Sequence, residues 1–169
     1  QKLAEACAKY GEALKIDPGF VSCYTNRAAA YLMQQQFLPC ANDASAALVL
    51  MGLEEPGDER NRNVVTSDTD SSKNSSDAQT QVVPHVKLSP SGLTGPVPAD
   101  GTPKYTKWLV NIYVKRGVAR AQLGLLEEAF KDYSEAHALD PKNKQVAQDR
   151  KRLKKRLPKQ STSTSTESQ

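Results

Sequence analysis

The sequence of 169 residues has few of the residues that build metal centres or catalytic sites. It contains two histidines, His85 and His137, and three cysteines, Cys7, Cys23 and Cys40, with no C-x-x-C or Cys–His spacing among them. Zinc sites need closely spaced thiolate or imidazole ligands, so we expect no metal. There is also no Gly-rich phosphate loop, no H-E-x-x-H and no nucleophile elbow. We therefore expect neither an enzyme nor a cofactor.

Long apolar runs are missing as well. No segment approaches the ~20 apolar residues of a transmembrane helix, and no signal peptide is visible, so no membrane partner is expected. Hydrophobic residues make up 38% of the chain and charged residues 25%, with a mean hydropathy of -0.61. This composition is typical of a small helical domain accompanied by disordered sequence. In such a domain the cysteines are expected to pack as small apolar residues in a reducing cytosol.

The feature around which the chain is organised is the segment 110–143, VNIYVKRGVARAQLGLLEEAFKDYSEAHALDPKN. Its apolar and small residues predict two antiparallel helices. Small residues such as Gly117 and Ala129 let the two helices approach closely, and Tyr133 fills the gap that remains between them. Pro141 ends the second helix, because proline lacks a backbone donor and disfavours helix in the residue before it.

The landmarks of this segment recur earlier in the chain. The second-helix landmarks match residues 123 positions earlier, which are Ala6, Tyr10, Ala13, Ile16 and Asp17-Pro18. Its first helix, 113–120, matches 24–31 at a separation of 89, and a middle copy of the second helix contains Cys40, Ala44, Ala47 and Leu50. After whole units of 34 residues are subtracted, both separations leave the same excess of 55 residues between the second and third repeats.

This pattern resembles the tetratricopeptide repeat (TPR), a 34-residue helical hairpin. Tyr113 takes the place of the family's Trp, and Gly117 takes that of its Gly. Arg116 and Arg120 stand where Leu and Tyr are usual, so we expect them to weaken the inner face of that helix. The resemblance implies an all-α solenoid of TPR helical hairpins, ending in a C-terminal capping helix.

The repeat register divides the chain into four parts. Residues 1–51 hold the second helix of a truncated first repeat and a complete second repeat. Residues 52–106 form a mostly disordered acidic insertion rich in Ser, Pro and Gly, which buries too little apolar surface to offset the entropy of ordering it. Residues 107–157 hold the third repeat and a basic capping helix, and 158–169 form a disordered Ser/Thr tail. Since Gln1 falls at a turn in this register, we expect the first helix of the first repeat to lie upstream.

Charge is distributed unevenly along the chain. The net charge is +4, but residues 104–169 hold fifteen basic and seven acidic side chains. Six of the basic residues gather in the capping helix: Arg150, Lys151, Arg152, Lys154, Lys155 and Arg156. One interpretation is a nuclear-import or nucleic-acid-binding patch, although no aromatic residues interleave the run for base stacking. The alternative is a solvated helix face, and binding to nucleic acid is not the function that we favour.

The TPR resemblance also implies a peptide-binding groove lined by the first helix of each repeat. Some TPR domains hold the acidic C-terminal tails of the seventy- and ninety-kilodalton heat-shock chaperones in a two-carboxylate clamp. With Val110 and its repeat equivalents as place one, the clamp residues at place six would be Asn26 and Lys115. Asn111 stands at place two, where the family has Lys, and Lys107 one turn earlier is the candidate to supply that charge. Met33 is a further candidate groove residue; the alternative is that all of these are ordinary solvated side chains.

The strings NRAAAYL and VKRGVARAQLGLLEEAFKDYSEAHALDP, followed by a basic helix, also resemble the C-terminal TPR domains of axonemal dynein assembly factors. This likeness covers residues 2–51 and 107–157, and the long acidic insertion departs from it. It implies a co-chaperone that assists cytoplasmic preassembly of dynein arms, with dynein assembly clients as partners. The expected location is the cytoplasm, with the nucleus and the neighbourhood of cilia as alternatives.

Overall fold

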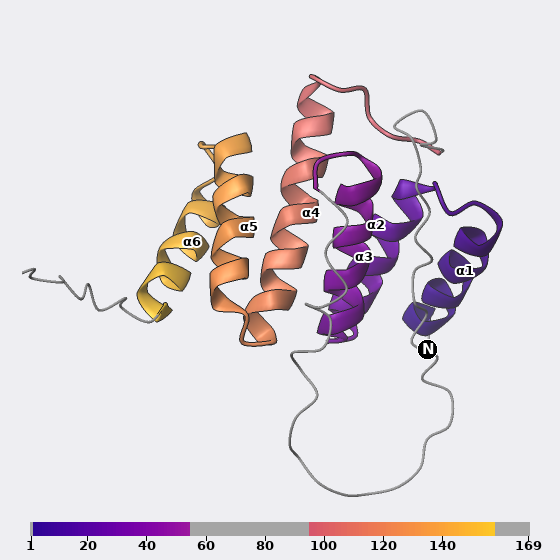
Figure 1. Cartoon of the computed structure of the whole chain (residues 1–169), viewed down its shortest axis with the longest axis horizontal. Coiled ribbons are helices and arrows are strands. Elements are labelled where there is room, and N and C mark those ends of the chain that lie inside the picture. Colours follow the sequence, from indigo (N-terminus) through magenta and orange to yellow (C-terminus); the bar gives the residue numbers. More distant parts are fainter. Residues whose placement is uncertain (1, 55–94, 158–169) are drawn as a thin grey trace, which may run out of the picture.

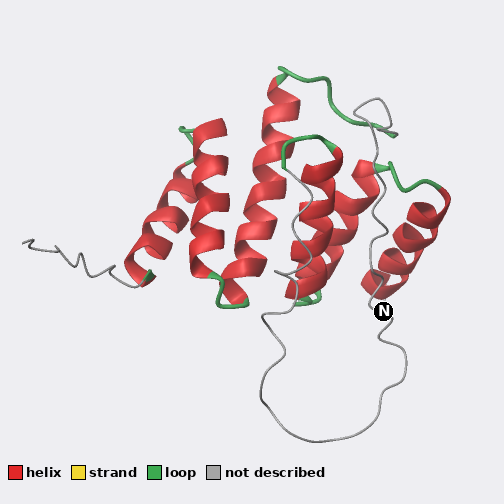
Figure 2. Ribbon diagram, viewed as in Figure 1, coloured by secondary structure: helices red, strands yellow, loops and turns green. Residues whose placement is uncertain are grey.

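The computed structural model describes residues 2–54 and 95–157, which form helices and loops without a strand (Figure 2). The helices are α1 (Lys2–Ile16), α2 (Val21–Met33), α3 (Phe37–Leu50), α4 (Pro103–Gln122), α5 (Leu126–Leu139) and α6 (Lys144–Arg156). They follow one another from α1 at one end of the molecule to α6 at the other, with α2 and α3 overlapping in this view (Figure 1). None of the described helices is long and apolar enough to cross a membrane. The all-α prediction is confirmed, while the disorder predicted for 55–94 and 158–169 concerns residues outside the described part.

The helix bounds follow the repeat register closely. Helices α2 and α6 are each 13 residues long, and α3 and α5 are each 14 residues long. The turns inside the second and third repeats also match, because Gln35 (φ 59°) and Gly124 (φ 82°) both adopt the left-handed conformation at the same place. Glycine reaches this conformation without strain, whereas glutamine does so at some cost. The turn of the second repeat is therefore the more strained of the two.

Helix α4 begins inside the segment that the repeat register assigned to the insertion. The Thr102 hydroxyl caps it by accepting a hydrogen bond from the backbone N–H of Tyr105 (3.2 Å), and Pro103 occupies the first turn, where its missing N–H costs nothing. The first helix of the third repeat therefore extends four residues into the segment 52–106.

The loop before α4 returns over the α1–α2 connection. Gly95 lies against the Phe20 ring so closely that a Cβ on Gly95 would be 2.0 Å from it. Val97 packs onto the apolar cluster that contains Leu14, Val21 and Tyr24. The last residues of the predicted insertion thus belong to the packed domain. This contact could not be predicted from the repeat pattern, because its two sides are far apart along the chain.

The core consists of small residues where helices cross and large residues between them. Ala44, Ala129 and Ala136 are at most 1% exposed, so the helix backbones approach closely there. As predicted, Gly117 is required for the contact with Tyr133, because a Cβ on Gly117 would lie 2.9 Å from that ring. All three cysteines are buried and free, which agrees with their expected role as small packing residues.

Candidate functional site

The two predicted clamp residues lie on neighbouring first helices. Asn26 is exposed on α2, and Lys115 is half-buried on α4. They occupy the same place of the repeat, 89 residues apart, and α2 contacts α4 directly. The fold therefore brings an amide and an ammonium group onto equivalent positions of adjacent repeats, as the register predicted.

Lys115 is an ammonium group without a counter-charge among the described residues. Burial lowers the pKa of Lys115, and no carboxylate in the described part of the chain pairs with its side chain. The Cys40 thiol lies close by and donates weakly to the Lys115 carbonyl oxygen (3.9 Å). Burial and the charge of Asp43 raise the pKa of Cys40 to about 11, so this thiol stays neutral at physiological pH. A partly desolvated cation without an anion is stabilised by any carboxylate that reaches it.

The remaining groove candidates extend along the first helices. Asn111 and Lys107 are both exposed and lie one and two turns before Lys115 on α4. Lys107 borders a hollow of about 550 Å³, whose other lining residues are Gly101, Pro103, Thr106, Val110, Leu139, Asp140 and Asn143. Met33 is 71% exposed at the end of α2, two turns after Asn26. Place two carries an amide where the resemblance implied a lysine, and the neighbouring charges on α4 are Lys107 and Lys115, each one turn away.

A buried ion pair holds the two helices of the second repeat together. The Arg27 guanidinium donates from Nε and Nη2 to the two carboxylate oxygens of Asp43, at 2.7 Å each. It also lies 5.8 Å from the ring centroids of both Tyr24 and Tyr31. This bidentate arrangement satisfies a charge that would otherwise be costly to bury.

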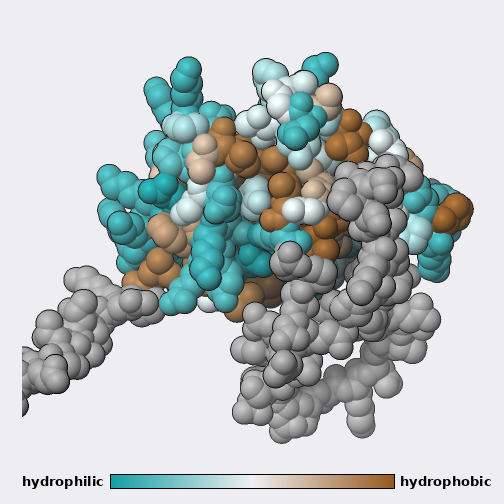
Figure 3. All heavy atoms as spheres, turned by 45° about the horizontal axis from the view of Figure 1, so that its top comes forward, coloured by the Kyte–Doolittle hydropathy of each residue, from teal (hydrophilic) through white to brown (hydrophobic). Residues whose placement is uncertain are grey.

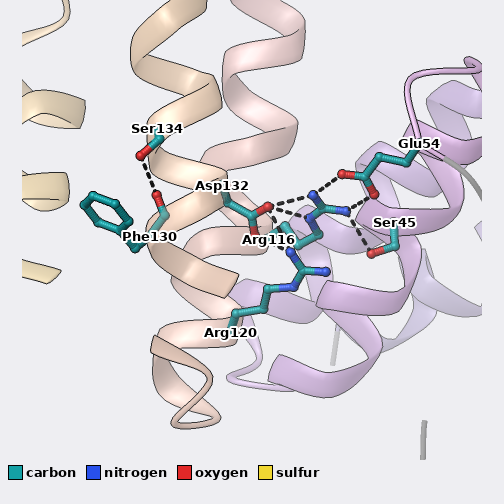
Figure 4. A network of polar contacts seen from close by, with 7 residues as sticks. All are labelled: Ser45, Glu54, Arg116, Arg120, Phe130, Asp132 and Ser134. Carbon is teal, nitrogen blue, oxygen red and sulfur yellow. Dashed lines mark hydrogen bonds and ion pairs between the residues drawn. The ribbon is translucent and has the colours of Figure 1, made fainter. Parts of the chain in front are cut away.

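A larger network occupies the same place in the third repeat (Figure 4). Arg116 donates from Nε to Asp132 Oδ1 (3.0 Å) and from Nη1 to the Ser45 hydroxyl (3.1 Å), and both of its Nη groups contact Glu54. Arg120 donates from Nη1 to both Asp132 oxygens at 2.9 Å. Burial alone would lower the pKa of Arg116, but the hydrogen bonds and charges of Glu54 and Asp132 outweigh it and raise that pKa.

This network corrects the expectation that Arg116 and Arg120 weaken their helix. Arg116 is only 2% exposed, and Asp132 only 1%, so both belong to the core. The sequence did hold the signal, because Arg27 and Asp43 stand 89 residues before Arg116 and Asp132. A basic and an acidic residue recurring together at two places of a repeat indicate an ion pair.

The basic residues of α6 fall into two groups. The first group lies next to α5: the Arg150 guanidinium is 6.0 Å from the Phe130 ring centroid, and Lys151 and Lys154 border a hollow beside His137. The buried Nδ1 atom of His137 has no hydrogen-bond partner among the described residues. The second group faces solvent: Arg152 pairs with Asp149 (3.2 Å), and Lys155 and Arg156 are exposed. Among the described residues, no cluster of His, Cys, Asp and Glu could hold a metal.

No protein-family profile and no curated protein matches the chain. Solved structures do match it. The Arabidopsis OM64 TPR domain has a TM-score of 0.55 and 22% identity, covering 92% of this chain and 84% of that domain. The first TPR of Spaghetti (RPAP3), bound to the HSP90 peptide SRMEEVD, has a TM-score of 0.55 and 23% identity, covering 92% and 80%. The second TPR domain of human RPAP3, in complex with the HSP70 peptide SGPTIEEVD, has a TM-score of 0.53 and 21% identity, covering 90% of this chain and 82% of that domain. The chain therefore has the TPR solenoid fold.

Proposed function

We propose that the chain is a protein–protein interaction adaptor that binds the acidic C-terminal tails of heat-shock chaperones along its first helices. The observation that carries this proposal is the half-buried ammonium group of Lys115, with which no described carboxylate pairs, one repeat away from the exposed amide of Asn26. Two similar TPR structures are complexes with HSP90 and HSP70 peptides that end in EEVD, which supports the choice of ligand.

A tail ending in Asp presents two carboxylates, one on the side chain and one at the chain terminus. We assign one carboxylate to the Lys115 ammonium and the other to the Asn26 amide. Asn111 contributes an amide where other family members have a lysine, and Lys107 adds positive charge one turn away. Because one charged contact is missing, the expected dissociation constant is about micromolar or weaker, roughly -8 kcal/mol at best.

Calorimetric titration of the chain with the heptapeptide SRMEEVD tests this proposal. Lys115→Glu places a carboxylate opposite a carboxylate and is expected to abolish detectable binding. Asn26→Ala removes one hydrogen bond to a charged group and is expected to weaken binding by about 1–3 kcal/mol. Arg152→Ser is the matched control, because Arg152 is exposed on α6, and it is expected to bind like the wild type.

Helix content measured by circular dichroism is expected to be the same in all three variants. A peptide with an amidated C-terminus is expected to bind more weakly, since it lacks the terminal carboxylate. If Lys115→Glu binds the acid peptide as tightly as the wild type, the groove is not the site and the proposal fails.

We further propose that this adaptor acts as a cytoplasmic co-chaperone in the preassembly of axonemal dynein arms, with dynein subunits as clients. The support is the resemblance of its repeat strings and basic capping helix to those assembly factors. Replacing the protein in a ciliated cell by Lys115→Glu is expected to remove dynein arms from axonemes in electron micrographs. Arg152→Ser is expected to preserve them, and normal arms in the Lys115→Glu cells would contradict this role.

A further inference from the structure

Helix α6 repeats the register of the two earlier first helices, α2 and α4. It follows α4 by one repeat of 34 residues, and its bounds match those of α2. Places three and ten of the register are buried in all three helices. The residues there are Cys23 and Ala30 on α2, Ile112 and Ala119 on α4, and Val146 and Leu153 on α6. These two places dock each first helix onto the part of the array that precedes it, and α6 is docked in the same way as the others.

Four other places distinguish α6 from α4. On α4 they are Tyr113, Arg116, Gly117 and Arg120, which lie against α5, the second helix of the same repeat. On α6 they are Ala147, Arg150, Lys151 and Lys154. Two of these side chains are half-buried and two are exposed, and together with His137 they line a hollow of about 270 Å³. We call the surface of α4 on which α5 packs the seat of α5. The hollow beside α6 is the equivalent seat one repeat later.

The contacts of α5 with α4 show which side chain binds at such a seat. Asp132 enters between Arg116 and Arg120 and accepts hydrogen bonds from both guanidinium groups. The equivalent pair on α6 is Arg150 and Lys154, so the seat again carries two cations at the same spacing. In the described part of the chain no carboxylate pairs with either of them, and the Arg150 guanidinium lies over the Phe130 ring. Among the described residues, no carboxylate lies between Arg150 and Lys154 as Asp132 lies between Arg116 and Arg120.

We propose that the hollow between α5 and α6 is a docking site for an acidic amphipathic helix of a partner protein. The helix would lie on α6 as α5 lies on α4, and it would place a carboxylate between Arg150 and Lys154. The next residue of that helix would be small, because Lys151 stands where Gly117 admits the ring of Tyr133. This site is separate from the groove residues Asn26 and Lys115 and does not depend on the proposed binding of chaperone tails.

Charge complementarity favours an acidic helix over a second copy of this chain. In a second copy, α3 and α5 are already packed against the first helices of their own repeats, which leaves α1 as the equivalent helix that could dock. At the place of Asp132, α1 carries Lys9, which is exposed and paired with Glu12. Docking α1 on α6 would bring Lys9 against Arg150, a repulsive contact. Hydrophilic side chains cover much of the α5–α6 end of the molecule (Figure 3), and α6 itself has seven basic residues against the single acid Asp149.

A peptide derived from α5 provides a probe with the required register. It consists of residues 125–140, LLEEAFKDYSEAHALD, with Tyr133→Ala so that it fits beside Lys151 and competes poorly for the seat on α4. Its ends are blocked and its helix is stapled on the outer face. On titration into the 169-residue chain we expect the NMR amide signals of His137 and Ala147 to shift. Arg150→Glu is expected to weaken binding at least about tenfold, as for a buried charge at an interface.

Arg152→Glu is the matched control, because it makes the same change of charge on the solvent side of α6 and is expected to alter the affinity less than about twofold. A probe carrying Asp132→Arg is expected to restore binding to the Arg150→Glu chain. The peptide SRMEEVD is expected to bind the Arg150→Glu chain as it binds the wild type.

Three results would overturn the proposal. The first is that the His137 and Ala147 signals stay unchanged, which would mean that the seat is already covered or does not accept a helix. The second is that Arg150→Glu and Arg152→Glu lower the affinity for the probe equally. Equally, a 16-base-pair DNA duplex could bind more tightly than the probe and lose the same affinity in both variants. This would identify a non-specific polyanion surface. The third is concentration-dependent self-association in sedimentation experiments that Arg150→Glu changes, which would identify a second copy as the occupant.

Discussion

The second and third repeats carry the same ion pair in different surroundings. In the second repeat Arg27 and Asp43 satisfy each other through two hydrogen bonds, and tyrosine rings flank the guanidinium. In the third repeat Arg116 bonds Asp132 inside its own repeat, and it also reaches back to Ser45 and Glu54 in the second. The simple pair fixes one hairpin, whereas the network fixes one hairpin and its junction with the preceding repeat.

The network lies at the junction that the long connection between α3 and α4 spans. The chain leaves α3 just before Glu54, and α4 does not begin until Pro103. Closing a long connection costs entropy, which adjacent repeats joined by a tight turn do not lose. The contacts of Glu54 with Arg116 hold one end of the connection, and the packing of Gly95 on Phe20 holds the other. Both ends of the connection are therefore attached to the array.

The strongest test of the comparison removes the acid from each repeat. Asp132→Asn leaves two guanidinium groups, Arg116 and Arg120, with only Glu54 to neutralise them, so we expect the free energy of unfolding to fall by about 3–5 kcal/mol. Asp43→Asn leaves one guanidinium between two aromatic rings, which offset part of the loss. We therefore expect the smaller loss for Asp43→Asn in urea unfolding followed by circular dichroism. Equal losses would mean that the additional contacts in the third repeat carry no net energy.

The second test concerns the helix crossing beside each ion pair. The third repeat uses Gly117 against Tyr133, and the second repeat uses Ala28 against Ala44 at the same places. Gly117→Ala puts a Cβ 2.9 Å from the Tyr133 ring, and we expect a net loss of about 1–2 kcal/mol after the better helix propensity of alanine is counted.

The double variant Gly117→Ala with Tyr133→Ala recreates the Ala–Ala crossing of the second repeat. In it the Gly117→Ala step is expected to become neutral or stabilising, because the ring that it meets is gone. A double-mutant cycle from thermal or urea unfolding measures this coupling. No coupling between the two positions would show that the ring moves aside without cost.

The third test separates the junction from the hairpin. Glu54→Gln keeps the shape of the side chain and removes its charge, leaving Arg116 with Asp132. Because the Glu54 side chain is 31% exposed, we expect a loss of only about 1–2 kcal/mol, smaller than for Asp132→Asn. Glu12→Gln, in an exposed pair with Lys9, is the control and is expected to change stability by less than about 0.5 kcal/mol. If both variants behave alike, Glu54 does not fix the junction.

The periodic part of the sequence predicted most of this fold, and the parts that depend on distant contacts escaped it. Helices and turns follow from apolar and small residues at repeat spacing, and the predicted match of 24–31 to 113–120 lies inside α2 and α4. The role of Arg116 depends on Glu54, 62 residues away. From the repeat pattern alone, this arginine was predicted to weaken its helix. The packing of Gly95 on Phe20 likewise needs a fold before it can be seen. At the candidate site, the register predicted the position of Lys115, but its burial beside Cys40 follows only from the packing of α4 on α3.

The smallest effect is one of pH, and it also contrasts the two repeats. Cys40 of the second repeat corresponds to Ala129 of the third, and both are fully buried. Burial raises the pKa of Cys40 from 9.0 to about 11, so above pH 9 the unfolded chain releases this proton before the folded chain does. The unfolded state then binds fewer protons, and stability falls as the pH rises from 9 towards 11. At pH 10 the loss from this thiol should be about 1 kcal/mol, since each pKa unit of difference between the folded and unfolded states is worth about 1.4 kcal/mol.

Cys40→Ala installs the residue of the third repeat and removes the thiol, while any cavity that it leaves costs the same at both pH values. Urea unfolding under reducing conditions at pH 7 and pH 10 should therefore show a smaller loss for the variant than for the wild type. An identical pH dependence of the two proteins would mean that the Cys40 thiolate is tolerated in the folded state, with the nearby ammonium of Lys115 as the group able to stabilise it.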